Sequence, residues 1–248
     1  MKSVITEVLE NETRKYSTNS LGYKRVMQEQ KVFKFLEGCS YIPGVIKMES
    51  SAAEASIVMN TLKGKSLREI LGVRDEFTIK PVSWKYAKQI LQQYVEAEMD
   101  LLNRGALYRD MNLDHIVFLD DRAYLVDLES TLTNVNHSNW TLKDMRGTWE
   151  TMAVEEFSGY GELSARTATY RVAAIAYIIL VGSLPFKRFP HSRSKTHRWR
   201  SRHPIEIDER LSKDVRRVFK VGMARKPMHR HKDPKSFLKQ LEKAYGYR

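Results

Sequence analysis

Two aspartates stand out as residues that could do chemistry. Asp110 lies in the segment Leu107–Phe118, which reads LYRDMNLDHIVF, and Asp127 follows seventeen residues later in YLVDLES. The apolar residues before Asp127 predict a buried strand that ends in a charge, and such a charge needs a partner. Phosphoryl transfer uses two carboxylates, one to position the attacking hydroxyl and one to hold Mg²⁺ against the phosphates. Taken alone, the two residues would equally fit a turn cap and a surface charge.

The elements that would position these aspartates can be predicted from the spacing of apolar residues. His115–Leu119 and Ala123–Asp127 read as two short strands joined by a tight turn. Ahead of them, we expect a long helix from Ser83, which can cap it, to about Arg104, because its apolar residues recur at helical spacing. One aspartate would then end the second strand, and the other would lie in the loop before the first strand.

The first part of the chain favours strands. Residues 3–9 and 13–17 predict a hairpin, and Ser56–Thr61 predicts a buried strand. Leu21–Leu36 predicts a helix, and Lys65–Leu71 predicts a shorter one. The later part of the chain looks mainly helical.

This order of elements predicts an α+β fold with two lobes. A reduced, β-rich N-terminal lobe would span residues 1–62, and a mainly helical C-terminal lobe would span residues 63–248, within one domain overall. The most apolar run, Val172–Val181, has half the ~20 residues needed to cross a bilayer. We therefore interpret it as a buried helix and expect no transmembrane segment.

Composition and charge bear on the location of the protein and on its partners. The chain has 248 residues, a formal net charge of +12 and one cysteine, Cys39. A single cysteine excludes a disulfide within the chain and fits a reducing, cytoplasmic location. Residues 187–203, KRFPHSRSKTHRWRSRH, concentrate the positive charge. They fit either a solvated surface loop or a docking patch for an acidic protein, a nucleic acid or an anionic membrane.

Six segments of the chain resemble, in order, the motifs of the protein kinase superfamily, most closely its eukaryotic-type serine/threonine class. Residues 108–115, YRDMNLDH, resemble the catalytic loop H-R-D-L-x-x-x-N, and VDLE at 126–129 resembles the D-F-G element. GTWETMAVE at 147–155 is similar to the end of an activation segment. The other similarities are the strand, hinge and helix at 56–71, the buried helix at 170–186 and the loop KPMHRH at 226–231. One match would be weak, but six in order, across roughly 26–241, identify the family.

The resemblance implies a role for each matched residue. Asp110 would orient the substrate hydroxyl, and Asp127 would bind Mg²⁺. Glu29 matches the helix glutamate that pairs with a lysine on the ATP phosphates, and Lys15, fourteen residues earlier, is the best candidate for that lysine. Arg14 is adjacent to Lys15 and is the competing cation.

The resemblance also implies a nucleotide site and a structural ion pair. ATP would bind between the two lobes, where the hinge residues Asn60, Thr61 and Leu62 would contact it together with Lys15 and Asp127. Glu155 and Arg230 match a buried ion pair that ties the activation segment to the late helices.

Two departures from the family pattern concern the nucleotide. No sequence resembling G-x-G-x-x-G precedes Lys15, so we expect no glycine-rich phosphate lid. His115 stands where the second Mg²⁺ ligand is normally asparagine. Imidazole suits softer metals than Mg²⁺, which makes Mn²⁺ an alternative cofactor.

The other departures concern the surroundings of the catalytic loop. Tyr108 replaces a histidine, Asn112 replaces a lysine, and Ala168 falls where the buried helix normally carries an aspartate that steadies the loop. Leu128-Glu129 replace Phe-Gly. Arg109 could bind a phosphate on the segment between Asp127 and Glu155, whose candidate sites are Thr131, Thr133, Ser138, Thr141 and Thr148. The motif around Thr148 favours a structural or substrate-contacting role for that residue.

The sequence leaves three functions open. The first is an atypical ATP-dependent serine/threonine protein kinase that acts on a protein substrate, because both aspartates and the Lys15–Glu29 pair are present. The second is a pseudokinase that serves as a binding or allosteric scaffold, because the lid is missing and a metal ligand is altered. The third is a small-molecule kinase of the aminoglycoside or choline type, against which the segment 147–155 argues.

Overall fold

The computed structural model describes residues 3–73, 79–134, 147–148, 150–158, 163–185 and 205–246. The first described part is a four-stranded antiparallel sheet with the strand order β1-β2-β4-β3. The strands are β1 (Val4–Val8), β2 (Glu12–Ser17), β3 (Val45–Ser50) and β4 (Ala55–Asn60). The predicted hairpin and the predicted strand near 56–61 are confirmed. Sequence analysis missed β3, whose mostly exposed VIKMES pattern carries little alternation of apolar and polar residues.

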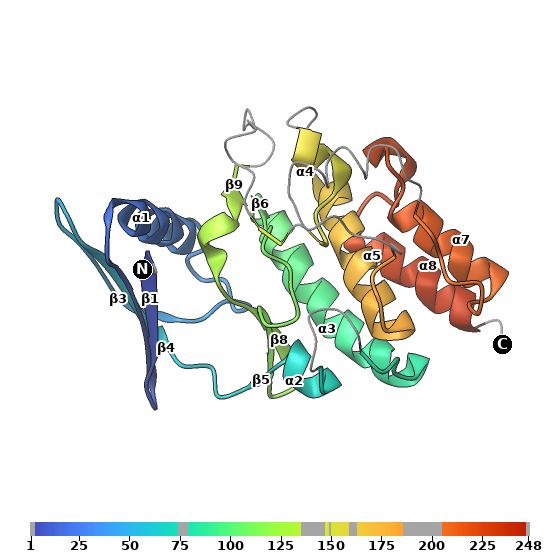
Figure 1. Ribbon diagram of the computed structural model, residues 1–248, viewed down its shortest axis with the longest axis horizontal. Helices are drawn as coiled ribbons and strands as arrows, with labels where there is room; N and C mark the ends of the chain where they lie inside the picture. The colour runs from blue at the N-terminus through green and yellow to red at the C-terminus, as the bar shows by residue number, and fades with distance from the viewer. Residues whose placement is uncertain are drawn as a thin grey trace.

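Helix α1 (Ser20–Phe35) covers one face of this sheet (Figure 1). The Asn19 side chain accepts a hydrogen bond from Gly22 N (2.9 Å), which caps the helix. Gly22 is needed for close packing, because a Cβ at this position would lie 1.6 Å from Ser3 O. The helix predicted at 21–36 is therefore confirmed, and its buried side includes Glu29.

A three-stranded sheet, β5-β7-β8, lies between the first sheet and the helices (Figure 1). Its strands are β5 (Lys65–Ser66), β7 (Ile116–Leu119) and β8 (Arg122–Leu125). The turn residues Asp120 and Asp121 have φ values of 49° and 55°, as a tight hairpin of this type requires. The helix predicted at 65–71 begins later, as α2 (Leu67–Leu71), because Lys65 and Ser66 pair with β7.

The helical part is built around α3 (Trp84–Asn103) and α5 (Ala165–Val181). Ser83 accepts a hydrogen bond from Tyr86 N (3.4 Å), and the predicted apolar side of α3 is buried apart from Leu102, which is half-buried. Every residue of α5 from 167 to 181 is buried, as predicted for the most apolar run. In the part of the chain that the structure describes, no helix is long and apolar enough to cross a membrane.

Shorter elements make up the rest of the helical part among the described residues. They are β6 (Ala106–Leu107), which pairs with β9 (Leu132–Thr133), the 3-10 helices η1 (Leu128–Ser130) and η4 (Pro227–His229), and α4 (Val154–Ser158), α7 (Lys213–Gly222) and α8 (Pro234–Gly246). Helix α5 packs against α3, α7 and α8, and α3 also packs directly against α8. The α+β fold with a sheet-rich N-terminal part and a helical C-terminal part is confirmed, while the lobe boundary after residue 62 stays a prediction.

Candidate active site

A lysine on β2 and a glutamate on α1 form a buried ion pair. Lys15 Nζ lies 3.0 and 2.9 Å from the two carboxylate oxygens of Glu29, and the Lys15 and Glu29 residues are 9% and 2% exposed. Arg14 is exposed and pairs with Glu12 instead. Successive side chains of a strand point to opposite faces, so only one of the two adjacent cations can face α1. The structure therefore brings Lys15, and not Arg14, to Glu29.

The same lysine reaches the second predicted aspartate. Lys15 Nζ lies 2.8 Å from Asp127 Oδ1. Burial lowers the pKa of Lys15, but the charges of Glu29 and Asp127 outweigh this effect and hold the pKa above its ordinary value. Burial likewise opposes ionisation of Asp127, but the charge and hydrogen bond of Lys15, together with the nearby His115 and Arg25, outweigh it and hold the pKa of Asp127 below its ordinary value.

The backbone at Asp127 is in the left-handed region, with φ 58° and ψ 69°. A non-glycine residue keeps this conformation only where its surroundings hold it. Here Leu128 N donates a hydrogen bond to Glu29 Oε1 (3.0 Å), and Arg25 Nη2 lies 2.9 Å from Glu129 Oε1. Both contacts tie the turn after Asp127 to α1, so one helix positions the lysine, the turn and the aspartate together.

The first predicted aspartate faces the same place from the loop before β7. Asp110 Oδ2 lies 3.4 Å from His115 Nδ1, and His115 Nε2 lies 3.7 Å from Asp127 Oδ2. One ligand atom from each of the three side chains lies within 4.8 Å of the others. Two carboxylates and an imidazole are a donor set that fits a divalent transition metal such as Mn²⁺ and, less well, Mg²⁺.

The tautomer of His115 decides whether its outer nitrogen can bind a metal. His115 Nδ1 lies 3.0 Å from Asp110 O, which can only accept, and 3.1 Å from Asn112 Nδ2, which can only donate. Asn112 Nδ2 also has Thr148 Oγ1 as an acceptor at 3.3 Å. With the proton on Nδ1, the bond to Asp110 O is made and the Nε2 lone pair is left for a metal.

The carboxylate of Asp110 is fixed by the end of the segment that resembles an activation segment. Thr148 Oγ1 donates a hydrogen bond to Asp110 Oδ1 (2.6 Å). Gly147 precedes it with φ +100°, and a Cβ there would lie 2.2 Å from Arg109 O. Only glycine lets the two segments approach so closely.

Tyr108 connects the two segments that carry the aspartates. Its hydroxyl lies 2.7 Å from Val126 O and 3.1 Å from Asp110 O, and its single hydrogen can be donated to either carbonyl. The ring is fully buried. Sequence analysis recorded Tyr108 only as a departure from the family pattern, whereas the structure shows that it connects the Asp110 and Asp127 backbones.

The three hinge residues, Asn60, Thr61 and Leu62, lie where the chain leaves β4 for β5. Thr61 N donates to Asn11 O (3.1 Å), and the Thr61 hydroxyl lies 2.9 Å from that of Thr13. The hinge is thus tied to the hairpin of β1 and β2. Contact of these residues with a nucleotide stays a prediction.

The predicted pair of Glu155 and Arg230 is confirmed. Arg230 Nη1 and Nη2 lie 2.6 and 2.8 Å from the two carboxylate oxygens of Glu155. Thr167 Oγ1 donates to Glu155 Oε1 (2.9 Å), and the Arg230 guanidinium lies over the Tyr170 ring, 4.9 Å from its centroid. The pair joins the start of α4 to α5 and to the loop before α8.

The expectation for Arg109 needs correction. A phosphate-binding arginine must be accessible, but Arg109 is 1% exposed and its Nε donates to Glu156 Oε1 (3.1 Å). Sequence analysis missed Glu156 and its second partner, Arg171. The signal available was weak, namely an acidic residue next to Glu155 and an arginine directly before the apolar run 172–181 of α5. The basic stretch 187–203 and the candidate phosphorylation sites Ser138 and Thr141 lie outside the described residues.

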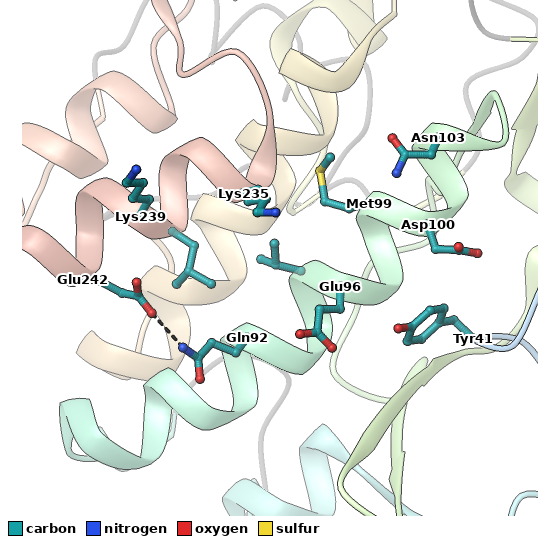
Figure 2. Close-up of a pocket in the computed structure, with 11 residues that line it drawn as sticks. Tyr41, Gln92, Glu96, Met99, Asp100, Asn103, Lys235, Lys239 and Glu242 are labelled. Carbon is teal, nitrogen blue, oxygen red and sulfur yellow. Dashed lines mark hydrogen bonds between the residues drawn. The ribbon is translucent and has the colours of Figure 1, made fainter.

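A cavity of about 700 Å³ lies elsewhere, between α3 and α8 (Figure 2). Tyr41, Glu96, Met99 and Lys235 are among its lining residues, and Gln92 donates to Glu242 (2.8 Å) at one end. None of the residues predicted for phosphoryl transfer lines it.

Comparisons with known proteins agree with the fold. No protein-family model matches the chain, and no curated protein matches it in sequence. Among solved structures, the chain is similar to the kinase PK-1 of the Cydia pomonella granulovirus, with a TM-score of 0.74 and 16% sequence identity. The match covers 93% of this chain and 85% of that chain. At this identity the similarity shows a protein-kinase-like fold.

Proposed function

We propose that this protein is an atypical ATP-dependent protein kinase that transfers a phosphoryl group to a serine or threonine hydroxyl of a protein substrate in the cytoplasm. The observation that carries the proposal is the convergence of four side chains from distant parts of the chain. Lys15 Nζ contacts Asp127, and the side chains of Asp110 and His115 face the same carboxylate. Positioning and charge stabilisation are the main requirements of phosphoryl transfer, and this cluster supplies groups for both.

Each residue has a separate task in the proposed reaction. Lys15, oriented by Glu29, would hold the ATP phosphates, and the segment Asn60–Leu62 would hold the base. Asp127 and His115 would hold a divalent cation, which when bound neutralises charge on the phosphates. Asp110, fixed by Thr148, would accept the hydrogen bond of the substrate hydroxyl and orient its oxygen.

Two contacts of Lys15 favour a second function, that of a scaffold that does not transfer phosphate. Lys15 is bound to both Glu29 and Asp127, so the charge that would hold phosphate is already neutralised by two carboxylates. His115 also stands in place of the usual asparagine. A scaffold that uses this closed cluster for stability, without transferring phosphate, would have the same contacts.

Binding of the nucleotide is measured first, from the melting temperature of the full chain with ATP and either Mg²⁺ or Mn²⁺. A ligand at 100 times its dissociation constant stabilises the folded state by about 2.7 kcal/mol. We expect a clear rise for the wild type and a smaller one for Asp127→Asn, because that variant lacks a metal ligand. An unchanged melting temperature at millimolar ATP with both metals would exclude the nucleotide site.

Transfer is measured next, from radiolabelled ATP to a mixture of protein substrates and to the chain itself. Asp110→Asn should lower transfer about 10²- to 10⁴-fold, the usual contribution of a positioned acid–base group, and should leave ATP binding nearly intact. Equal background transfer by the wild type and Asp110→Asn in both metals would contradict the kinase and leave the scaffold.

A further inference from the structure

A buried carboxylate, Glu156, accepts hydrogen bonds from three different segments. Arg171 on α5 donates from Nη2 to Oε1 (2.6 Å) and from Nε to Oε2 (2.9 Å). Ala153 N donates to Oε2 (2.9 Å), and Arg109 Nε donates to Oε1 (3.1 Å). The side chains of Arg109, Glu156 and Arg171 are 1%, 0% and 0% exposed. We call these three residues the Glu156 cluster.

The Glu156 cluster is fixed by charge as well as by geometry. Burial opposes ionisation of Glu156, but the guanidinium groups of Arg171 and Arg109 outweigh it and hold the pKa of Glu156 below its ordinary value. The carboxylate is therefore charged at neutral pH. Hydrogen bonds between ionised groups are shorter and stronger than neutral ones, and their directions are more strictly set.

One member of the cluster, Arg109, is adjacent in sequence to the proposed catalytic residue Asp110. Arg109 precedes Asp110, and α5, which carries Arg171, is buried along nearly its whole length. One turn before Arg171 stands Ala168, a fully buried residue whose methyl side chain cannot accept a hydrogen bond. The side chain at that position therefore cannot hydrogen-bond the loop of Asp110, whereas Arg171 and Glu156 connect α5 to this loop through Arg109.

We propose that Glu156 is a positioning residue, which holds the loop of Asp110 on α5 through Arg109 and makes phosphorylation of the segment between Asp127 and Glu155 unnecessary for activity. The inference rests on the proposed phosphotransferase function. Glu156 follows directly after that segment, and it supplies to Arg109 the negative charge that a phosphate would otherwise bring. This charge is permanent, because Glu156 is part of the chain and its side chain is fully buried.

The first test uses Arg109→Met, which should fold. It removes the link to the catalytic loop, fills most of the same volume and leaves Glu156 paired with Arg171. We expect kcat to fall about 10- to 100-fold with little change in KM for ATP, because a small misplacement of Asp110 affects the reaction and not the binding of nucleotide. The matched control is Glu155→Gln, which damages the buried ion pair of the adjacent glutamate with Arg230. It should lower the melting temperature but leave kcat of the folded protein unchanged.

A second measurement does not depend on activity. Amide hydrogen exchange of residues 106–116 should be faster in Arg109→Met than in the wild type, and unchanged in Glu155→Gln. The proteins are compared under conditions in which each has the same free energy of unfolding. Unchanged exchange and unchanged kcat in Arg109→Met would overturn the positioning role. If the wild type transfers no phosphate, the proposed function fails and hydrogen exchange alone decides whether Arg109 positions the loop.

The phosphate requirement is tested by treating the purified wild type with phosphatase before the transfer assay. We expect full activity from protein that mass spectrometry shows to be unmodified in the segment 128–154. Loss of activity after phosphatase, with recovery after incubation with ATP, would overturn the independence from phosphorylation.

Discussion

The candidate active site and the Glu156 cluster are built from the same kinds of charged residues, yet water reaches only one of them. Asp110, His115 and Asp127 side chains are 19%, 21% and 32% exposed, whereas no side chain of the Glu156 cluster exceeds 1%. A partly hydrated carboxylate can exchange its protein partner for a ligand at small cost. A carboxylate that is sealed in the core cannot, because loss of its partner leaves a desolvated charge. The first set of charges is therefore suited to binding and the second to holding elements together.

If burial decides the cost of removing a charge, the largest effect is expected at Glu155, which forms a buried ion pair with Arg230. Glu155→Ala leaves Arg230 buried without its carboxylate, and removing one member of such a pair costs about 3–5 kcal/mol. The free energy of unfolding from urea denaturation measures this cost. The double variant with Arg230→Ala should lose less than the sum of the two single changes, since neither charge is then left alone. Strictly additive losses would show that the pair carries no coupling.

A pH-dependent effect is expected from Glu98, which is fully buried on α3. Burial raises its pKa from 4.5 to about 8, against the opposing influence of Arg171 and the hydrogen bond from Tyr94. Because the folded state holds this proton more tightly than the unfolded chain, stability falls as the pH rises from about 4.5 to about 8, with a limiting slope of about 1.4 kcal/mol per pH unit.

Glu98→Gln keeps the shape of the side chain and cannot ionise. The difference in unfolding free energy between the variant and the wild type should therefore grow in favour of the variant from pH 5 to pH 8 and then level off. Other titrating groups cancel in this difference. A difference that does not change with pH would show that Glu98 is charged in the folded protein over the whole range.

A smaller effect is expected in the candidate active site, where a proposed metal-binding side chain can be replaced without loss of the fold. His115→Asn replaces an imidazole by an amide oxygen, which suits Mg²⁺ better than softer metals. We expect the ratio of transfer rates in Mn²⁺ and Mg²⁺ to shift about tenfold towards Mg²⁺, with the melting temperature nearly unchanged. The same metal preference in both proteins would mean that His115 does not bind the metal.

The smallest effect should come from a charge pair on the surface. Arg14 and Glu12 side chains are 51% and 37% exposed, and exposed pairs of this kind contribute from nothing to about 1 kcal/mol. Arg14→Gln should change the free energy of unfolding by less than about 0.5 kcal/mol. A loss comparable to that of Glu155→Ala would break the relation between burial and the cost of removing a charge.

Much of the fold could be predicted because local rules determine it. Ser83 caps α3, the repeated apolar residues form its buried side, and Asp120-Asp121 adopt the turn conformation that suits aspartate. Local rules could not decide whether Arg14 or Lys15 pairs with Glu29. The pairing depended on the register of β2 against β4, which decides the face of the sheet to which each side chain points.

The sequence by itself determined which motifs are present and in what order, and from these the positions of Asp110, Asp127 and the Glu155–Arg230 pair. Only the tertiary structure decided that Arg109 turns inward and that Glu156, not its neighbour, binds it. Glu155 and Glu156 are identical in type and adjacent in a short helix, so their separation into two ion pairs depends on how α4 is rotated against α5. The physical reason is that the energy of a buried charge depends on partners brought from distant segments, and neither their distance nor their hydration is encoded in any local pattern of residues.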